Sequence, residues 1–296
     1  MRDAAVNDKS DIERAFEFPG ALKAGILLAA LLFLYFPSFA DMVGTWRNSE
    51  AYSHGFLIPF VSAFLVWRKR KSLQSLSTET YSRGFFMFLA GLVLLLAGSL
   101  AFDPFTFRIS FLLVLSGLLL IFLGREIFRE LAFPIGYLFF MIPLPYIFMK
   151  SMAVGMKLTY AKLTYLAVSA AGVPILMEGV CLELPNASLV VGDYCTGVLS
   201  IVAITAISTL YAYLSQRTLA GMALLVILAV PLAMLGNMLR LVSTVWLTYI
   251  YGPRVLDSAI HKYHGLLNFL ITMAFLILLA KGVSVIDSKL AKEVPG

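Results

Sequence analysis

Residue types that act together in acyl transfer occur far apart in this sequence: Cys195, Arg240 and the histidine pair His261 and His264. Cys195 precedes Gly197 at the start of an apolar run, where the unpaired amides of a helix start favour a thiolate. A nearby cation such as Arg240 would lower the thiol pKa further. The alternative is a buried structural cysteine. This pattern makes Cys195 a candidate nucleophile.

Two polar residues share one helical face in the run that contains Arg240. Asn237 lies three residues before Arg240, and residues at that spacing are neighbours on a helix. The alternative is an interfacial arginine that extends towards lipid head groups. Two polar groups on one face of an apolar helix favour a pocket.

The histidines suit proton transfer better than metal binding. His261 and His264 are three residues apart, and an imidazole titrates near neutral pH. A metal site would need further ligands at matching spacing, and no such motif occurs in the sequence. We therefore expect no metal and no cofactor. His54, in the stretch Tyr52-Ser53-His54-Gly55, is expected to lie in a loop or at the end of a span near the site, with Tyr52 beside it.

The second cysteine has a different setting. Cys181 lies in a stretch where apolar residues alternate with Cys181 and Glu183, followed by a Pro185-Asn186 turn. Such alternation is typical of a strand, so residues 174–193 are expected to form a small β-hairpin in which Cys181 is structural. A Cys181–Cys195 disulfide is the alternative, and it would remove the nucleophile.

The composition fixes the elements that must position these residues. Of 296 residues, 60% are hydrophobic and 14% charged, against about 45–50% and about 25% in soluble domains. A single core cannot hide this much apolar surface, so we predict an all-α polytopic membrane protein with about eight spans. The net charge of +6 fits basic residues beside the membrane better than nucleic-acid binding.

Hydrophobic runs locate eight expected spans. They are Ala21–Ala40, Gly55–Trp67, Gly84–Phe102, Ile109–Leu123, Leu131–Met149 (ending near Met141), Thr196–Leu214, Leu219–Leu239 (with an extension to Tyr251 left open) and Leu266–Ala280. Residues 146–172 are expected to form an interfacial or tilted helix whose lysines contact lipid. Residues 1–19 and 283–296 are expected to be cytoplasmic tails on either side of a single domain, 20–282.

A basic cluster sets the expected orientation. Arg68-Lys69-Arg70-Lys71 follows the second span, and basic residues beside a span stay in the cytoplasm. Counting spans from there places the hairpin, Cys195, Arg240 and both histidines at the extracytoplasmic face. A charge within the bilayer is costly unless it has a partner or a function. Because these residues are all expected at one membrane face, their location favours a functional site there.

At these residues the sequence resembles the exosortase/archaeosortase family of membrane transpeptidases, more closely its bacterial branch. Three blocks carry the resemblance: Cys195-Thr196-Gly197, Asn237 to Arg240 as Asn-x-x-Arg, and His261 to Gly265 as His-x-x-x-Gly. The Tyr-Ser-His-Gly stretch at residues 52–55 and the Ile-Pro-Leu-Pro stretch at residues 142–145 are also similar. The likeness extends from about residue 20 to about residue 280.

The resemblance implies roles and partners. Cys195 would be the nucleophile, Arg240 the cation that activates it or binds the oxyanion, and His261 the acid/base, with His264 and Asn237 in support. Substrates would be exported proteins with a C-terminal tail: a short motif such as Pro-Glu-Pro, a transmembrane helix and a basic cluster. The protein would lie in the cell (inner) membrane, in contact with lipid. The oligomeric state stays open.

Two rival functions remain at this point. A transporter or polysaccharide-export component would carry its polar residues near the middle of the membrane, on broken helices. A peptidase that uses water as acceptor would share the whole site with a transpeptidase.

Overall fold

The computed structural model describes residues 20–192, 197–256 and 259–293, which are mostly helical. The elements are α2 (Gly20–Asn48), η1 (Glu50–Phe56), α3 (Leu57–Arg68), α4 (Arg70–Gln74), α5 (Gly84–Leu100), α6 (Pro104–Tyr137), η2 (Leu138–Met141), α7 (Tyr146–Ala170), β1 (Leu176–Glu178), β2 (Cys181–Leu184), β3 (Ala187–Val190), α8 (Val198–Ser215), α9 (Leu219–Tyr251), η4 (Pro253–Val255) and α10 (Ala259–Glu293).

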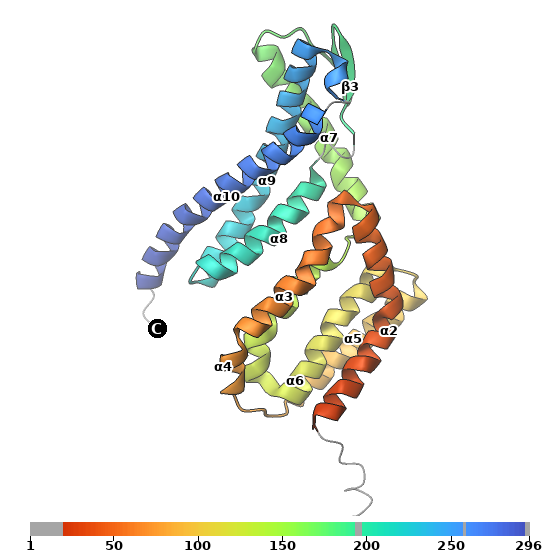
Figure 1. Ribbon diagram of the computed structural model, residues 1–296, viewed down its shortest axis with the longest axis vertical. Helices are drawn as coiled ribbons and strands as arrows, with labels where there is room; N and C mark the ends of the chain where they lie inside the picture. The colour runs from red at the N-terminus through yellow and green to blue at the C-terminus, as the bar shows by residue number, and fades with distance from the viewer. Residues whose placement is uncertain (1–19, 193–196, 257–258, 294–296) are drawn as a thin grey trace, which may run out of the picture.

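The helices form two groups (Figure 1). In the first, α2, α3 and α5 pack against α6, and their shared core includes Tyr35, Phe111 and Val114. In the second, α8 and α10 pack against α9, around Leu225, Ala229 and Leu276. The chain passes from the first group to the second through α7 and the small sheet.

Within the described residues, four stretches are long and apolar enough to cross a membrane: Gly25–Asn48, Pro104–Met141, Leu219–Tyr251 and Gly265–Ser288. Two shorter apolar helices, Gly84–Leu100 and Ser200–Ser215, accompany them. The extension of α9 to Tyr251, which the sequence left open, is therefore helical. The chain is a helical membrane protein.

A glycine divides α6 into two helices. Gly124 has φ 85° and ψ 179°, a backbone conformation that favours glycine, and it lies directly against the carbonyl of Glu79. The two segments are residues 104–123 and 125–137. The break falls where the sequence predicted that the span Ile109–Leu123 would end.

The sheet is a three-stranded antiparallel meander in the order β1-β2-β3. Leu182 pairs with both Met177 and Leu189, and its side chain is fully buried. That face of the sheet packs on α7 and α9, through Tyr160 and Val245. The sequence indicated a hairpin at residues 174–193, and the structure adds one strand to it.

Helices α9 and α10 are antiparallel and in contact near both ends. At one end, buried Asp287 accepts hydrogen bonds from the Thr218 hydroxyl and, at 2.6 Å, from the Arg217 amide. At the other end, Arg240 lies against Gly265. Thr218 and Arg240 are 22 residues apart, and so are Gly265 and Asp287. At 1.5 Å per residue both intervals span about 33 Å.

Candidate active site at one end of α9 and α10

The first contact in the site joins Gly197 to Asn237. Gly197 has φ 64° and caps the start of α8. A β-carbon at this position would overlap the side chain of Asn237, which is 4% exposed. Both the backbone conformation and the space therefore require glycine. Because of this contact, the Cys-Thr-Gly block and the Asn-x-x-Arg block meet.

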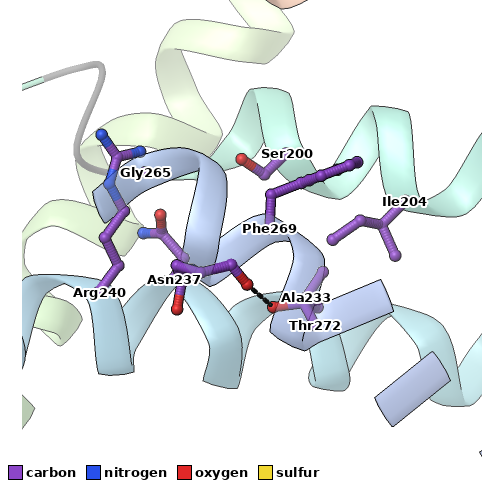
Figure 2. Close-up of a pocket in the computed structure, with 9 residues that line it drawn as sticks. Ser200, Ile204, Ala233, Asn237, Arg240, Gly265, Phe269 and Thr272 are labelled. Carbon is purple, nitrogen blue, oxygen red and sulfur yellow. Dashed lines mark hydrogen bonds between the residues drawn. The ribbon is translucent and has the colours of Figure 1, made fainter. Parts of the chain in front are cut away.

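The second contact joins Arg240 to Gly265. A β-carbon at Gly265 would lie 3.2 Å from Nη2 and 3.3 Å from Cζ of Arg240, so the guanidinium rests on the glycine backbone. Figure 2 shows the Arg240 side chain extending from α9 towards Gly265 on α10. The Asn-x-x-Arg block therefore also meets the His-x-x-x-Gly block.

A small pocket lies between α8, α9 and α10 where these contacts are made, with a cavity volume of about 20 Å³. It is lined by Ser200, Ile204, Ala233, Asn237, Arg240, Gly265, Asn268, Phe269 and Thr272. A volume of this size holds about one water molecule. The pocket therefore accommodates a single oxygen-sized group beside amide, hydroxyl and guanidinium donors.

Arg240 has no carboxylate partner within the described part of the chain. The ion pairs found there join Lys69 to Glu130 and Arg108 to Asp41. A guanidinium has five N–H donors and keeps its charge at any physiological pH. Among the described side chains, no carboxylate competes for these donors.

The predicted nucleophile, Cys195, lies outside the described residues. His261 and His264 belong to α10, and their side chains are likewise outside the description. His261 is one helical turn before Gly265, whereas His264 directly precedes it. The described neighbours of all three residues, Gly197 and Gly265, both lie at the pocket region.

Cys181 is a free thiol on β2, with its Sγ 3.1 Å from the hydroxyl oxygen of Ser188. The structural role expected for Cys181 stays a prediction. The alternative of a disulfide with Cys195 finds no support at Cys181.

Tyr52 and His54 do not line the pocket. They lie on η1, which packs against α8, and their ring centroids are 6.4 Å apart. Burial raises the pKa of the Tyr52 hydroxyl above its usual value. These two residues are thus near α8 and outside the lining of the pocket.

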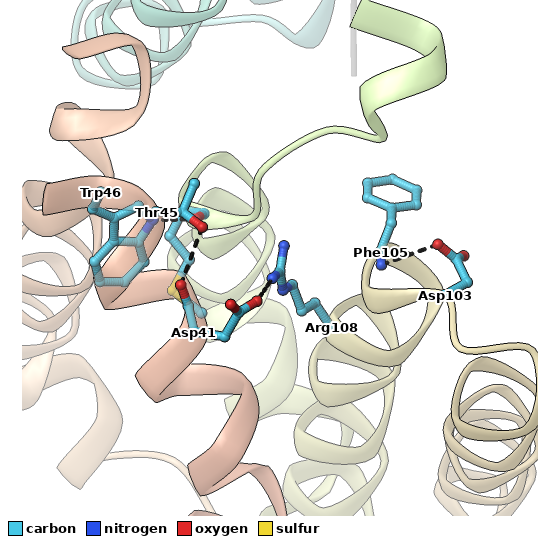
Figure 3. Close-up of polar contacts among 7 residues, drawn as sticks. Asp41, Thr45, Trp46, Asp103, Phe105 and Arg108 are labelled. Carbon is cyan, nitrogen blue, oxygen red and sulfur yellow. Dashed lines mark hydrogen bonds and ion pairs between the residues drawn. The ribbon is translucent and has the colours of Figure 1, made fainter. Parts of the chain in front are cut away.

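The position of η1 is fixed by α2. The Trp46 indole N–H donates to the carbonyl of Met141 at 2.9 Å, and Gly55 lies flat on the Trp46 ring. An ion pair between Asp41 of α2 and Arg108 of α6 joins α2 to α6 as well (Figure 3). The first helix group therefore holds η1 against α8.

Three polar residues of the pocket were missed from the sequence as site residues: Ser200, Asn268 and Thr272. The Thr272 hydroxyl donates to the Asn268 carbonyl at 2.9 Å. The sequence could have identified two of them, because Asn268 and Thr272 follow Gly265 by three and seven residues and share one face of an apolar helix. Phe269, the aromatic that follows the histidine block, also lines the pocket.

Within the described residues, no three side chains among His, Cys, Asp and Glu gather closely enough to hold a metal ion.

In comparisons with known proteins, residues 46–278 match the family model described as transmembrane exosortase. No curated protein and no solved structure matches the chain significantly.

Proposed function

This chain belongs to the transmembrane exosortase family, and we propose that it cleaves C-terminal sorting signals of exported proteins and transfers them to an acceptor. Family membership indicates a membrane transpeptidase in general. The observation that carries the specific proposal is that the described glycines of two blocks lie against the Asn-x-x-Arg block, Gly197 against Asn237 and Gly265 against Arg240.

The proposed chemistry proceeds through a thioester. The Cys195 thiolate attacks a backbone carbonyl carbon, a C–S bond forms, and the carbonyl electrons move onto oxygen. Arg240 donates hydrogen bonds to this oxyanion. When the oxyanion collapses, the C–N bond breaks and protonated His261 gives its proton to the departing amine. An amine, a hydroxyl or water then attacks the thioester, neutral His261 takes the proton that this acceptor loses, and the Cys195 thiolate leaves.

The surroundings of Arg240 support its role. Among the described side chains its guanidinium has no carboxylate partner. It rests against Gly265 and lines the pocket beside Asn237. A fixed donor needs little reorganisation when charge develops, which is the main source of electrostatic catalysis.

We place the site at the extracytoplasmic face of the inner membrane, on eight spans. The basic cluster Arg68–Lys71 would be cytoplasmic. In α9 the apolar stretch from Leu219 to Arg240 is about 31 Å long, close to the thickness of the hydrocarbon core. Arg240 would then lie at the membrane boundary, and the rest of α9 would project beyond it with the sheet.

A reporter with a defined tail tests the proposal. The tail carries Pro-Glu-Pro, an apolar helix of about 20 residues and a basic cluster. Wild-type protein is expected to cleave it in cells, whereas Cys195→Ala and Arg240→Lys leave it intact, since a point charge cannot replace the planar guanidinium. Cys181→Ala is the matched control and should process normally.

Mass spectrometry of the new C-terminus separates the two possible acceptors. An added group means transfer, and a free carboxylate means hydrolysis. Processing by Cys195→Ala at equal protein level would refute the thioester mechanism.

A further inference from the structure

Strand β3 has a free edge. The Val191 amide donates to the Val180 carbonyl at 2.9 Å, and hydrogen-bonded pairs alternate along an antiparallel ladder. In the register of β2 and β3, the backbone groups of Ser188 and Val190 therefore point away from β2. Within the described residues no strand pairs with this edge. Two N–H and two C=O groups are thus open to a further strand.

This edge leads to the pocket. At its start, the Asn186 side chain donates to the carbonyls of Thr248 and Tyr249 near the end of α9, at 3.2 and 3.0 Å. At its end, Val191 is buried with Leu241, the neighbour of Arg240. Figure 1 shows the sheet beside this end of α9.

The lengths agree with this path. Residues 187–191 of an extended strand cover about 13 Å, and residues 240–248 of a helix cover about 12 Å. Strand β3 therefore runs along α9 from the level of Thr248 towards Arg240. Four residues after Val191 in the sequence stands Cys195.

We propose that the free edge of β3 binds the extended segment of the sorting signal before the cleaved bond, as a parallel fourth strand. This inference rests on the proposed function. Strand addition uses backbone hydrogen bonds, so it can bind an extended segment with little dependence on its side chains. The exposed side chains of Ser188 and Val190 flank the added strand on one sheet face.

The direction of the substrate chain follows from topology. The exported domain of a substrate lies on the side of the sheet, and its apolar helix enters the membrane near the level of Arg240. The segment between them runs from the sheet towards the pocket, as β3 does. The added strand is therefore parallel to β3.

Disulfide cross-linking tests the direction. Cys181→Ser with Cys195→Ala removes both native cysteines and leaves the reporter uncleaved. Ser188→Cys or Val190→Cys is then combined with single cysteines along the reporter tail. Neighbouring strands lie within disulfide range. If Ser188→Cys links to one reporter position, Val190→Cys should link to the position two residues later. Glu178→Cys on β1 lies two strands away on the same sheet face and should not link.

A second measurement tests the hydrogen bonds in active protein. Ser188→Pro removes an N–H that points outwards, and proline is tolerated on a free edge. Processing at low substrate concentration should fall about fivefold to tenfold, as for one lost backbone hydrogen bond, with little change at saturation. Met177→Pro removes the outward N–H on the opposite edge and is the matched control.

The outcomes separate the two proposals. Wild-type protein that leaves the reporter intact refutes the proposed function. Normal processing with no link at Ser188→Cys or Val190→Cys overturns strand addition. Links between earlier reporter positions and Val190→Cys would mean an antiparallel segment. Links between two copies of the protein would mean a dimer interface. Either result also overturns the inference.

Discussion

The contact between Arg240 and Gly265 allows function to be separated from stability. In Gly265→Ala the new β-carbon would lie 3.2 Å from Nη2 and 3.3 Å from Cζ of Arg240. These distances are shorter than ordinary contacts, so the guanidinium must move by a few tenths of an ångström. Removing one oxyanion donor costs about 10²–10³-fold in rate, and small misplacements cost part of that. We expect processing to fall about tenfold to a hundredfold.

The fold should not suffer from this change. Gly265 lies within α10, and alanine is favoured over glycine inside a helix by up to about 1 kcal/mol. Gly282→Ala lies in the same helix with nothing within 4 Å of the added carbon, so it is the matched control. Both variants should melt at or above the wild-type temperature in detergent, and only Gly265→Ala should accumulate uncleaved reporter. Equal processing by the two variants would show that the position of Arg240 does not matter to the reaction.

His261→Ala should slow processing by about 10²–10⁴-fold, the usual share of a general acid/base, and His264→Ala should cost less; the reverse order would show that the histidine assignment is wrong. Gly197→Ala should destabilise the protein by about 2–4 kcal/mol, from a left-handed backbone and an overlap with Asn237, and an unchanged melting temperature would contradict this packing. Reporter fusions after residues 72 and 290 should be cytoplasmic and a fusion near residue 187 extracytoplasmic; a cytoplasmic signal at 187 would refute the orientation. Asp103 caps α6, and hydrogen bonds from the Thr106 hydroxyl and amide lower its carboxyl pKa. The stabilisation of the fold by this carboxylate is therefore fully present above the pKa that Asp103 has in the unfolded chain. It is lost as the pH falls through the lower pKa that Asp103 has in the folded protein. Asp103→Ala should cost about 1 kcal/mol of stability at neutral pH and less at acid pH. Thermal melts of the wild type and of this variant, each at neutral and at acid pH, measure the two costs.

Much of the fold could be predicted from local sequence. Apolar runs marked the helices because lipid and core both select apolar residues, and the run Ile109–Leu123 ended where Gly124 breaks α6. Alternating residues marked the strands near Cys181. The third strand was missed because β1 has only three residues, Leu176–Glu178, too few for a periodic signal.

The site was less accessible to sequence reasoning. Asn237 and Arg240 could be placed on one helical face because both lie in one periodic segment. That Asn237 lies on Gly197, and Arg240 on Gly265, depends on packing between helices, which no local period specifies. The contribution of Asn268 to the pocket depends on the same packing.

The two contacts between α9 and α10 are equally spaced on both helices, so this helix pair sets a fixed length. Thr218–Asp287 and Arg240–Gly265 fix an interval of 22 residues between the two ends of the pair. On the proposed function, a substrate anchored by its own apolar helix in the same bilayer would be measured against this interval. Each residue removed from that helix shifts the cleaved bond by about 1.5 Å relative to Arg240. Four residues shift it by about 6 Å, beyond hydrogen-bond reach. Hydrophobic thickness, together with sequence, would therefore decide which tails are cut, and membranes of different thickness would select different substrates.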